Sequence, residues 1–205
     1  MSKIKHFIEQ SWLLIVCSFC FGLLIAVANA AWSERIEQNK VTKLNNLMRG
    51  LLPKAAKFEA ADSFKITTRK GDTFESNIFK ALSDSNECVG WAFNCQGPGF
   101  QDKIELVVAV DKVFGEFSGF DVLFSNETPG FGDKIKLPDW RGQFMGAPCV
   151  SLQLTKTGDI ETIDSEIVAI TGATVSSDAV VSILNKCVAQ IKDEMINKGL
   201  ISNVK

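Results

Sequence analysis

The sequence predicts an α+β protein in which an antiparallel-rich sheet with packed helices is preceded by one N-terminal transmembrane helix. Three observations support this fold class. A long uncharged apolar run lies near the N-terminus, short β-rich stretches separated by turn residues fill the middle, and a long amphipathic helix lies near the C-terminus. Consecutive strands followed by a helix are typical of α+β domains.

Composition excludes several classes of function. The 205 residues are 46% hydrophobic and 22% charged, so general disorder is excluded. The 22 Lys and Arg residues are balanced by 24 Asp and Glu residues, which leaves no basic excess, and we expect no nucleic-acid partner. The single histidine, His6, precedes the apolar run. We therefore expect no histidine base and no His-ligated metal in the folded domain.

The apolar run has the properties of a membrane anchor. Its core, Trp12 to Ala31, has the length of about 20 residues that a bilayer-spanning helix needs. Trp12 and Trp32 lie at the two ends, where interfacial indoles are expected, and Lys3 and Lys5 precede the run. The positive-inside rule then places the N-terminus in the cytoplasm and the residues after the run outside. The localisation expected is the cell inner (cytoplasmic) membrane. The segments expected are a cytoplasmic N-terminus (1–10), a transmembrane helix (11–32), a juxtamembrane helix (33–53) and an extracytoplasmic domain (54–205).

Two alternatives to a simple anchor remain open. Ala28-Asn29-Ala30 resembles a signal-peptide cleavage site, although the apolar stretch is longer than a usual signal-peptide core. A lipoprotein interpretation of Cys17 is weaker, because Val16 occupies a place where a small residue is expected. Cys17 and Cys20 share one helix face, where they are either a ligand pair or, as we favour, small packing residues.

The other four cysteines are widely spaced and form no metal-type pair. In an exported domain a disulfide between Cys88 and Cys95 is conceivable, but their spacing alone does not establish it. The four are Cys88, Cys95, Cys149 and Cys187.

The domain elements follow from periodicity. Apolar residues at helical spacing predict a juxtamembrane helix that ends at Leu52-Pro53. A second helix is predicted over 179–195, with one apolar face and a stop at Gly199. Strands are predicted, weakly, at 64–68 and 74–79 and, more strongly, at 88–94 (followed by a turn at 96–99), 104–110, 117–124 and 150–154.

One chemistry-bearing segment is Glu127-Thr-Pro-Gly-Phe-Gly-Asp-Lys-Ile135, which follows the strand over 117–124. Two glycines and a proline give this strand-exit loop an unusual backbone path. Loops of this kind on a rigid scaffold often carry binding groups. A plain glycine-rich turn is the alternative.

The second segment is Thr171-Gly-Ala-Thr-Val-Ser-Ser-Asp178, which joins the apolar run 167–170 to the last helix. Small residues allow a ligand to approach the backbone. The start of a helix offers unpaired N–H groups and the positive end of its dipole, which suits a phosphate. Ordinary capping by Ser or Thr is the alternative.

Together, the loop and the helix start resemble the FMN-binding domain family, whose pattern is an ETPG-x-G loop followed by [S/T]-G-A-[S/T]. The resemblance covers about residues 88–190 and the anchor. Within the family, the single anchor and the chain length are similar to those of the G subunits of Rnf-type ion-translocating complexes. The C subunits of sodium-pumping NADH:quinone reductases are related.

The resemblance implies that the phosphate of FMN is esterified to Thr174, the second hydroxyl residue of the motif. It also implies a separate flavin transferase outside the membrane, with FAD as the donor and a divalent metal of its own. The loop would line the flavin ring, with Glu127 and Thr128 as polar contacts and Phe131 packed on its face. The remaining cofactor-binding residues expected are Thr171, Gly172, Ala173, Val175, Ser176, Gly130 and Lys134. No catalytic residue and no metal site are expected.

The chain departs from the family pattern at three positions. The family usually has an acidic residue where this sequence has Val168, and the nearest acids are Asp164 and Glu166. Thr171 and Phe131 stand where Ser and Leu are commoner. If the transferase requires the acid, attachment of the flavin is slow or needs another signal.

The leading hypothesis is therefore a membrane-anchored electron-relay subunit of an Rnf-type ferredoxin:NAD oxidoreductase that translocates ions together with other membrane and peripheral subunits. The chain itself would not bind NAD, because it has no strand-linked G-x-G-x-x-G. The alternatives are the quinone-reductase subunit, a stand-alone extracytoplasmic flavoprotein, and a non-redox sensory module that binds FMN.

Overall fold

The computed structural model describes the backbone of residues 2–201 and the side chains of residues 11–201. The chain forms two compact units, which divide between Lys43 and Leu44. Lys3, Lys5 and His6, on which the predicted orientation depends, lie outside the residues whose side chains are described.

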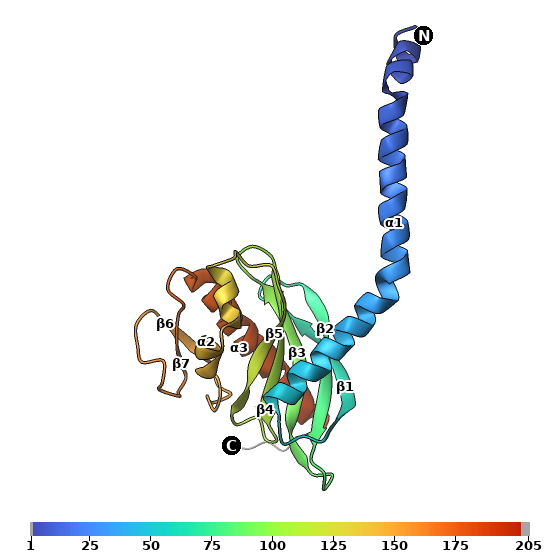
Figure 1. Cartoon of the computed structure of the whole chain (residues 1–205). Coiled ribbons are helices and arrows are strands. Elements are labelled where there is room, and N and C mark those ends of the chain that lie inside the picture. The colour runs from blue at the N-terminus through green and yellow to red at the C-terminus, as the bar shows by residue number, and fades with distance from the viewer. Residues whose placement is uncertain (1, 202–205) are drawn as a thin grey trace. The chain divides into compact units, whose positions relative to one another are not determined.

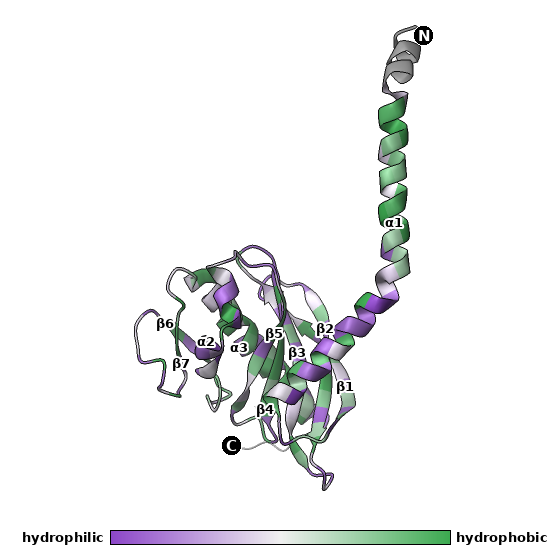
Figure 2. Ribbon diagram, viewed as in Figure 1, coloured by the Kyte–Doolittle hydropathy of each residue, from purple (hydrophilic) through white to green (hydrophobic). Residues whose placement is uncertain are grey.

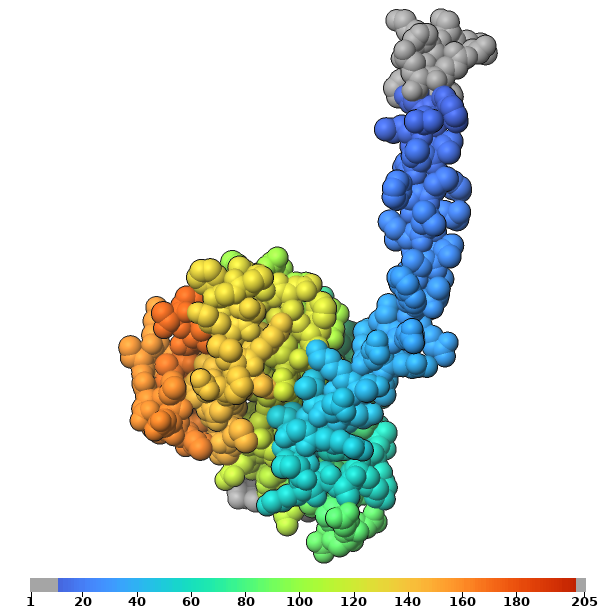
Figure 3. Space-filling model, in the orientation of Figure 1, coloured from blue at the N-terminus to red at the C-terminus, as the bar shows by residue number. Residues whose placement is uncertain are grey.

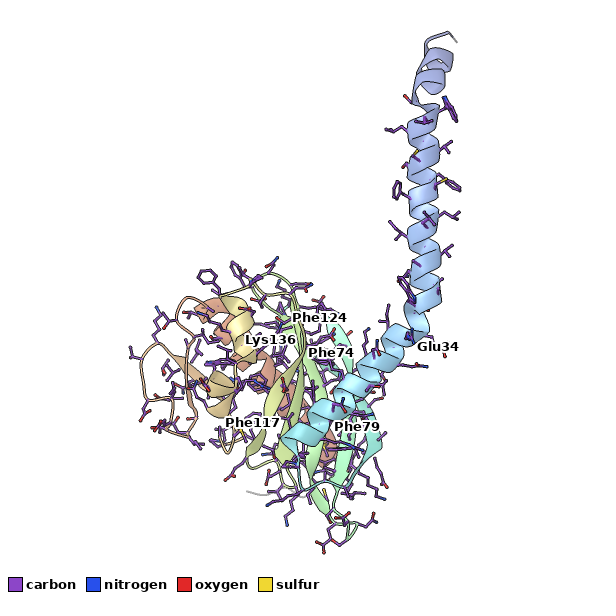
Figure 4. All side chains as sticks on the ribbon, in the orientation of Figure 1. Glu34, Phe74, Phe79, Phe117, Phe124 and Lys136 are labelled. Atoms are coloured by element: carbon purple, nitrogen blue, oxygen red, sulfur yellow. A yellow bond between two sulfur atoms is a disulfide. The ribbon has the colours of Figure 1, made fainter. Side chains whose placement is uncertain are left out.

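In the first unit, the chain is a single helix. Helix α1 (Ser2–Leu51) continues into the second unit without a break, so the predicted membrane and juxtamembrane segments are both helical. From Ser11 on it is long and apolar enough to cross a membrane, and its most apolar stretch has no residue buried in the molecule. In Figure 2 apolar residues dominate the upper coloured part of α1, whereas polar residues are frequent in its lower part, and Figure 4 shows side chains on several sides of the upper part. Cys17 and Cys20 are both exposed and free.

The second unit is built on a five-stranded antiparallel sheet in which neighbouring strands follow one another along the chain (Figure 1). After the sheet come a 3₁₀ helix, a short α-helix, a two-stranded parallel pair and the long C-terminal helix. The predicted α+β class is confirmed. The bounds are β1 (Lys57–Thr67), β2 (Thr73–Leu82), β3 (Cys88–Pro98), β4 (Lys103–Asp111), β5 (Phe117–Ser125), η1 (Gly132–Lys136), α2 (Pro138–Gly142), β6 (Gln153–Thr155), β7 (Glu166–Val168) and α3 (Thr174–Asn197).

Strand β4 is buried on both of its faces. Leu106, Val108 and Val110 belong to the main apolar cluster, which also contains the buried stripe of α3. Val107 and Ala109 point the other way, into a second cluster with Met48 and Leu52 at the end of α1. Each face is therefore covered by a helix, which explains the nearly continuous apolar run that the sequence shows here.

Helix α3 packs along the main cluster as its periodicity predicts. It begins at Thr174, five positions earlier than the predicted start at Ala179 (179 − 174 = 5), and it ends at Asn197. The predicted apolar face is buried at all eight of its positions: Ala179, Val180, Ile183, Leu184, Cys187, Val188, Ile191 and Met195. Gly199 has φ +68° and ends the helix, since its N–H donates to the carbonyl of Ile196.

The disulfide is not the Cys88–Cys95 pair that the sequence left open. Cys95 on β3 is bonded to Cys187 on α3, with 6.0 Å between the Cα atoms, and Cys88 is free. Cys88 opens β3 and Cys95 lies near its other end, so an extended strand separates their Cα atoms by roughly 20 Å. A disulfide needs Cα atoms within about 7 Å, which excludes the Cys88–Cys95 pair.

Two local predictions were also wrong. The turn predicted at 96–99 lies later, because β3 continues to Pro98 and the N–H of Gly99 closes the turn on the carbonyl of Asp102 at 2.8 Å. The strand predicted at 150–154 is reduced to β6. The Leu152 backbone instead pairs with the side chain of Asn185 on α3, through two hydrogen bonds of 2.8 Å.

The segments around residue 140 and residues 160–170 adjoin at one end of the domain (Figure 3). Trp140 of α2 donates its indole N–H to the carbonyl of Val168 at 2.8 Å. Gln143, which is 2% exposed, accepts the N–H of Val168 at 2.8 Å. These bonds fix β7 just before the Thr171-Gly172 turn that leads into α3.

Candidate functional site

The two motif segments meet. Phe131 in the loop after β5 and Thr171 in the turn before α3 are 40 positions apart in the sequence (171 − 131 = 40). Gly172 lies under the ring of Phe131, since a Cβ atom placed on Gly172 would lie 3.4 Å from the ring atom Cδ1. Gly172 has φ +81°, a backbone conformation that glycine adopts without strain. The pairing expected from the family pattern is therefore present in the fold.

The start of α3 carries the features of an anion site. The residue before the helix is Ala173, which makes no side-chain capping bond. The helix begins with Thr174, and its first turn contains no acidic residue. The N–H groups at such an end are orphaned and carry the positive end of the dipole, so a phosphate there gains about 0.3–1 kcal/mol from the dipole when exposed.

Four hydroxyls surround this helix start, and only two of them are exposed. Ser177 is fully buried and engaged twice, as a donor to the carbonyl of Ala173 and an acceptor of the N–H of Ile170. Ser176, 3% exposed, donates to Oε2 of Glu127. The exposed hydroxyl residues are Thr171 and Thr174.

Glu127 is 4% exposed and has both carboxylate oxygens engaged. Its Oε1 accepts the backbone N–H groups of Phe100 at 2.9 Å and Gln101 at 3.2 Å. Its Oε2 accepts the hydroxyl of Ser176. The carboxylate thus joins the β3–β4 turn, the loop after β5 and the first turn of α3.

A second contact connects the same turn and loop. Asn126 donates its side-chain amide to Oδ2 of Asp102 at 3.0 Å. The backbone N–H of Lys103 and this amide hold the pKa of the Asp102 carboxyl below its usual value. The carboxylate of Asp102 is therefore the form that pairs with the loop.

A cavity of about 460 Å³ opens between the segments. Thr174 is in its wall, and so are Thr128 and Phe131 from the loop. Four of the residues predicted for the site do not line it: Glu127, Gly130, Lys134 and Thr171. The lining residues are Phe100, Thr128, Phe131, Gly132, Gly172, Ala173, Thr174, Val175 and Ser176.

The sequence prediction missed Phe100, and it included Gly132 in the ring-lining loop without naming it as a binding residue. Phe100 lies in the β3–β4 turn and is 65% exposed, and no motif marks it. Gly132 lies inside the loop motif, but its closeness to Ser176 is visible only in the fold. A Cβ atom on Gly132 would lie 2.6 Å from the Ser176 hydroxyl oxygen, so only glycine fits there.

The residues present fit a flavin nucleotide. The volume lies within the ~300–1,000 Å³ range of ligand pockets. Two exposed phenylalanine rings, Phe100 and Phe131, and the exposed Val175 give apolar surface for a planar ring. The start of α3 gives the anion end, and the exposed Thr174 gives a hydroxyl in the same cavity.

Known proteins resemble this chain over most of its length. The family model for an FMN-binding domain matches residues 99–189. The G subunit of an ion-translocating oxidoreductase complex from Methanosarcina acetivorans is 28% identical, with 92% of this chain and 96% of that protein covered. The G subunit of the Na(+)-translocating ferredoxin:NAD(+) oxidoreductase complex from Acetobacterium woodii is 31% identical, with 84% and 86% covered. The corresponding proton-translocating complex from Clostridium ljungdahlii has a G subunit that is 30% identical, with 87% and 88% covered.

Solved structures share the fold. The crystal structure of NqrC from Shewanella oneidensis matches with a TM-score of 0.57 and 22% identity, covering 71% of this chain and 73% of that one. The C subunit of the Na(+)-translocating NADH-quinone reductase from Parabacteroides distasonis matches with a TM-score of 0.55 and 16% identity, covering 77% and 95%.

Proposed function

Because the chain belongs to the family of G subunits of ion-translocating oxidoreductase complexes, we propose that it is the membrane-anchored flavoprotein component of such a complex, with FMN esterified to Thr174. It relays electrons between other subunits of an Rnf-type ferredoxin:NAD oxidoreductase, and ion movement is coupled to that transfer. The observation that supports the attachment is that Thr174 is the exposed hydroxyl residue of the cavity wall, at the start of α3. Thr128 also lines the cavity, but it is half-buried and donates its hydroxyl to Oε1 of Gln101 at 3.4 Å.

Elimination among the four hydroxyls supports Thr174. Ser176 and Ser177 are buried and hydrogen-bonded, so neither offers a free oxygen to a phosphorus atom. Thr171 is exposed but lies outside the cavity wall. Thr174 is exposed, lines the cavity and is the first residue of α3. A phosphodiester there lies at the positive end of the helix.

The attachment step balances without an oxidant. The Thr174 oxygen forms a bond to the phosphorus on the flavin side of FAD, the pyrophosphate bond breaks, and AMP leaves. The hydroxyl proton goes to a base on a separate flavin transferase. Once bound, FMN supplies one- and two-electron chemistry. The chain's part is to hold the phosphate at α3, to pack the ring against Phe131 and Phe100, and to prevent loss of the cofactor.

The disulfide supports the proposed orientation. Cys95–Cys187 lies within the domain, and disulfides persist in oxidising compartments outside the cytoplasm. Lys3 and Lys5 ahead of the apolar run favour a cytoplasmic N-terminus. The domain that follows α1 is therefore proposed to lie on the periplasmic or extracytoplasmic side of the inner membrane.

Intact-mass measurement of the protein purified from its native host tests the attachment. The expected mass is that of the polypeptide plus esterified FMN, minus two hydrogens for the disulfide, and the unfolded band should fluoresce in a gel. A mass equal to the bare polypeptide in a host with an active transferase would contradict the proposal.

Two further measurements test the remaining parts. The tagged protein is expected to copurify with other membrane subunits and an iron–sulfur or NAD-binding subunit. Protease added outside spheroplasts is expected to cut the domain while the N-terminus stays protected. Recovery as a lone polypeptide would oppose the assignment to a complex, and digestion only after lysis would oppose the orientation.

A further inference from the structure

We propose that Glu127 is a positioning residue that assembles the flavin cavity, and that it does so as a hydrogen-bond acceptor without contacting the cofactor. The proposal rests on the proposed function, because the cavity is taken to be the FMN site. The family pattern implies a polar contact between Glu127 and the ring. The structure gives this side chain a different task.

Three chain segments meet at the one carboxylate. The β3–β4 turn donates the N–H groups of Phe100 and Gln101 to Oε1, at 2.9 and 3.2 Å. The first turn of α3 donates the Ser176 hydroxyl to Oε2. Phe100 and Ser176 both line the cavity, whereas Glu127 does not. The carboxylate therefore connects two parts of the cavity wall without lining the cavity itself.

The surroundings of Glu127 are closed by two glycines. A Cβ atom on Gly99 would lie 2.3 Å from Oε1, and one on Gly132 would lie 2.8 Å from Oε2. Any larger residue at either position would displace the carboxylate. Glu127 is 4% exposed, and no Lys or Arg is paired with it in the described part of the chain. The three donors named above engage both oxygens of Glu127, so neither is buried without a hydrogen-bond partner.

The bond to Ser176 also has a consequence for the site of attachment. Ser176 and Thr174 lie in the same turn of α3, and both line the cavity. Glu127 holds the Ser176 hydroxyl as a donor in the buried wall. The hydroxyl of Thr174 is left as the exposed acceptor for the phosphate. Glu127 thus contributes to both the shape of the cavity and the choice of hydroxyl.

The test compares two variants at one position. Glu127→Gln keeps the shape, since its carbonyl oxygen accepts from Phe100 and Gln101 and its amide donates to the oxygen of Ser176. Glu127→Ala removes all three bonds. We expect the initial rate of flavin attachment to fall at least about tenfold in Glu127→Ala and to stay within about threefold of wild type in Glu127→Gln.

Hydrogen exchange gives a readout that does not need flavin. In the flavin-free full chain, the amides of Phe100 and Gln101 should exchange about tenfold faster or more in Glu127→Ala, and at the wild-type rate in Glu127→Gln. Amides of β4 should stay protected in both. Ser176→Ala should leave Phe100 and Gln101 protected while it slows attachment, which keeps the proposal testable if Glu127→Ala does not fold.

The outcomes separate this proposal from the proposed function. Attachment lost equally in Glu127→Gln and Glu127→Ala would overturn the positioning role, because the carboxylate would then act chemically. Unchanged attachment and exchange in Glu127→Ala would overturn it as well. A wild-type protein that carries no flavin, but shows the expected exchange pattern, would refute only the proposed function.

Discussion

The start of α3 and the loop after β5 wall the same cavity but are held in place differently. Helix α3 is fixed by a buried apolar stripe and by the Cys95–Cys187 disulfide. The loop is held through its own residue Glu127, which accepts the N–H groups of Phe100 and Gln101 in the β3–β4 turn. Glycines at close contacts, such as Gly132 beside Ser176, also fix its path. The difference shows a division of labour. Under the proposed function, the helix would offer the hydroxyl that is esterified and the site for the phosphate, whereas the loop would determine the shape of the cavity.

The largest expected effect is the loss of covalent flavin in Thr174→Ala. The variant removes the exposed hydroxyl in the cavity wall and no bond that the structure records for the side chain. The fold should therefore be unchanged. In-gel fluorescence after denaturation measures the covalent flavin, and circular dichroism checks the fold. A fluorescent band that persists would place the attachment at another residue and contradict the role given to the start of α3.

Removal of the disulfide tests how firmly α3 is held. The Cys95→Ala/Cys187→Ala variant opens a loop with a sequence separation of 92, for which the chain-entropy model gives a loss of about 4–5 kcal/mol. The measurement is the free energy of urea unfolding of the full chain in detergent. An unchanged midpoint would show that the apolar stripe alone holds the helix.

Labelling of the free cysteines Cys88 and Cys149 measures whether the domain opens locally. Burial raises the pKa of the Cys149 thiol to about 12, so the thiol stays protonated at any pH well below this value. The thiolate is the reactive form, and Cys149 should resist maleimide at about pH 8 in the folded protein. Cys88 is partly exposed and should react. Rapid labelling of Cys149 would show that the domain opens locally.

A smaller effect is expected from Gly132→Ala in the loop. The added Cβ would lie 2.6 Å from the oxygen of Ser176 and 2.9 Å from Cβ of Glu127, neither of which is the far end of a long side chain. Overpacking of this kind costs about 1–3 kcal/mol, and flavin attachment should slow. Gly142→Ala is the matched control, because a Cβ there meets nothing within 4 Å. Equal stability of the two variants would contradict the loop's role in shape.

The smallest effect is expected from Thr171→Ala. Thr171 is exposed and lies outside the cavity wall, so attachment and stability should both stay close to wild type. Intact mass and a thermal melt measure these two quantities. A clear loss of attachment would show that the transferase binds the turn before α3 as well as its first residue.

The sequence predicted the elements that carry a local apolar signal. The strands near 104–110 and 117–124 were found as β-rich apolar stretches, and helix α3 was found because its apolar residues recur at helical spacing. The disulfide could not be found in this way. Its partners lie on β3 and α3, at a sequence separation of 92, and they come together only when the helix packs on the sheet.

The site was predicted in part, for a similar reason. The two motifs and Thr174 are local patterns, and the fold brings them together as expected. Phe100 carries no signal of its own, since it reaches the cavity only through strand pairing and the bond to Glu127. Glu127 was expected to contact the flavin ring because the family resemblance implies such a contact. Its burial behind the wall depends on contacts that no spacing in the sequence records.

The end of α1 has a practical meaning for anyone who wants the domain without its anchor. Leu44, Leu47, Met48 and Leu51 cover Ala92, Val107 and Ala109 on the face of the sheet opposite α3. A fragment that starts at Lys54 would expose this apolar face to water and invite self-association. A water-soluble domain should therefore be cut from the chain ahead of Leu44, where the second compact unit begins. A fusion to a foreign membrane helix should be made at the same place.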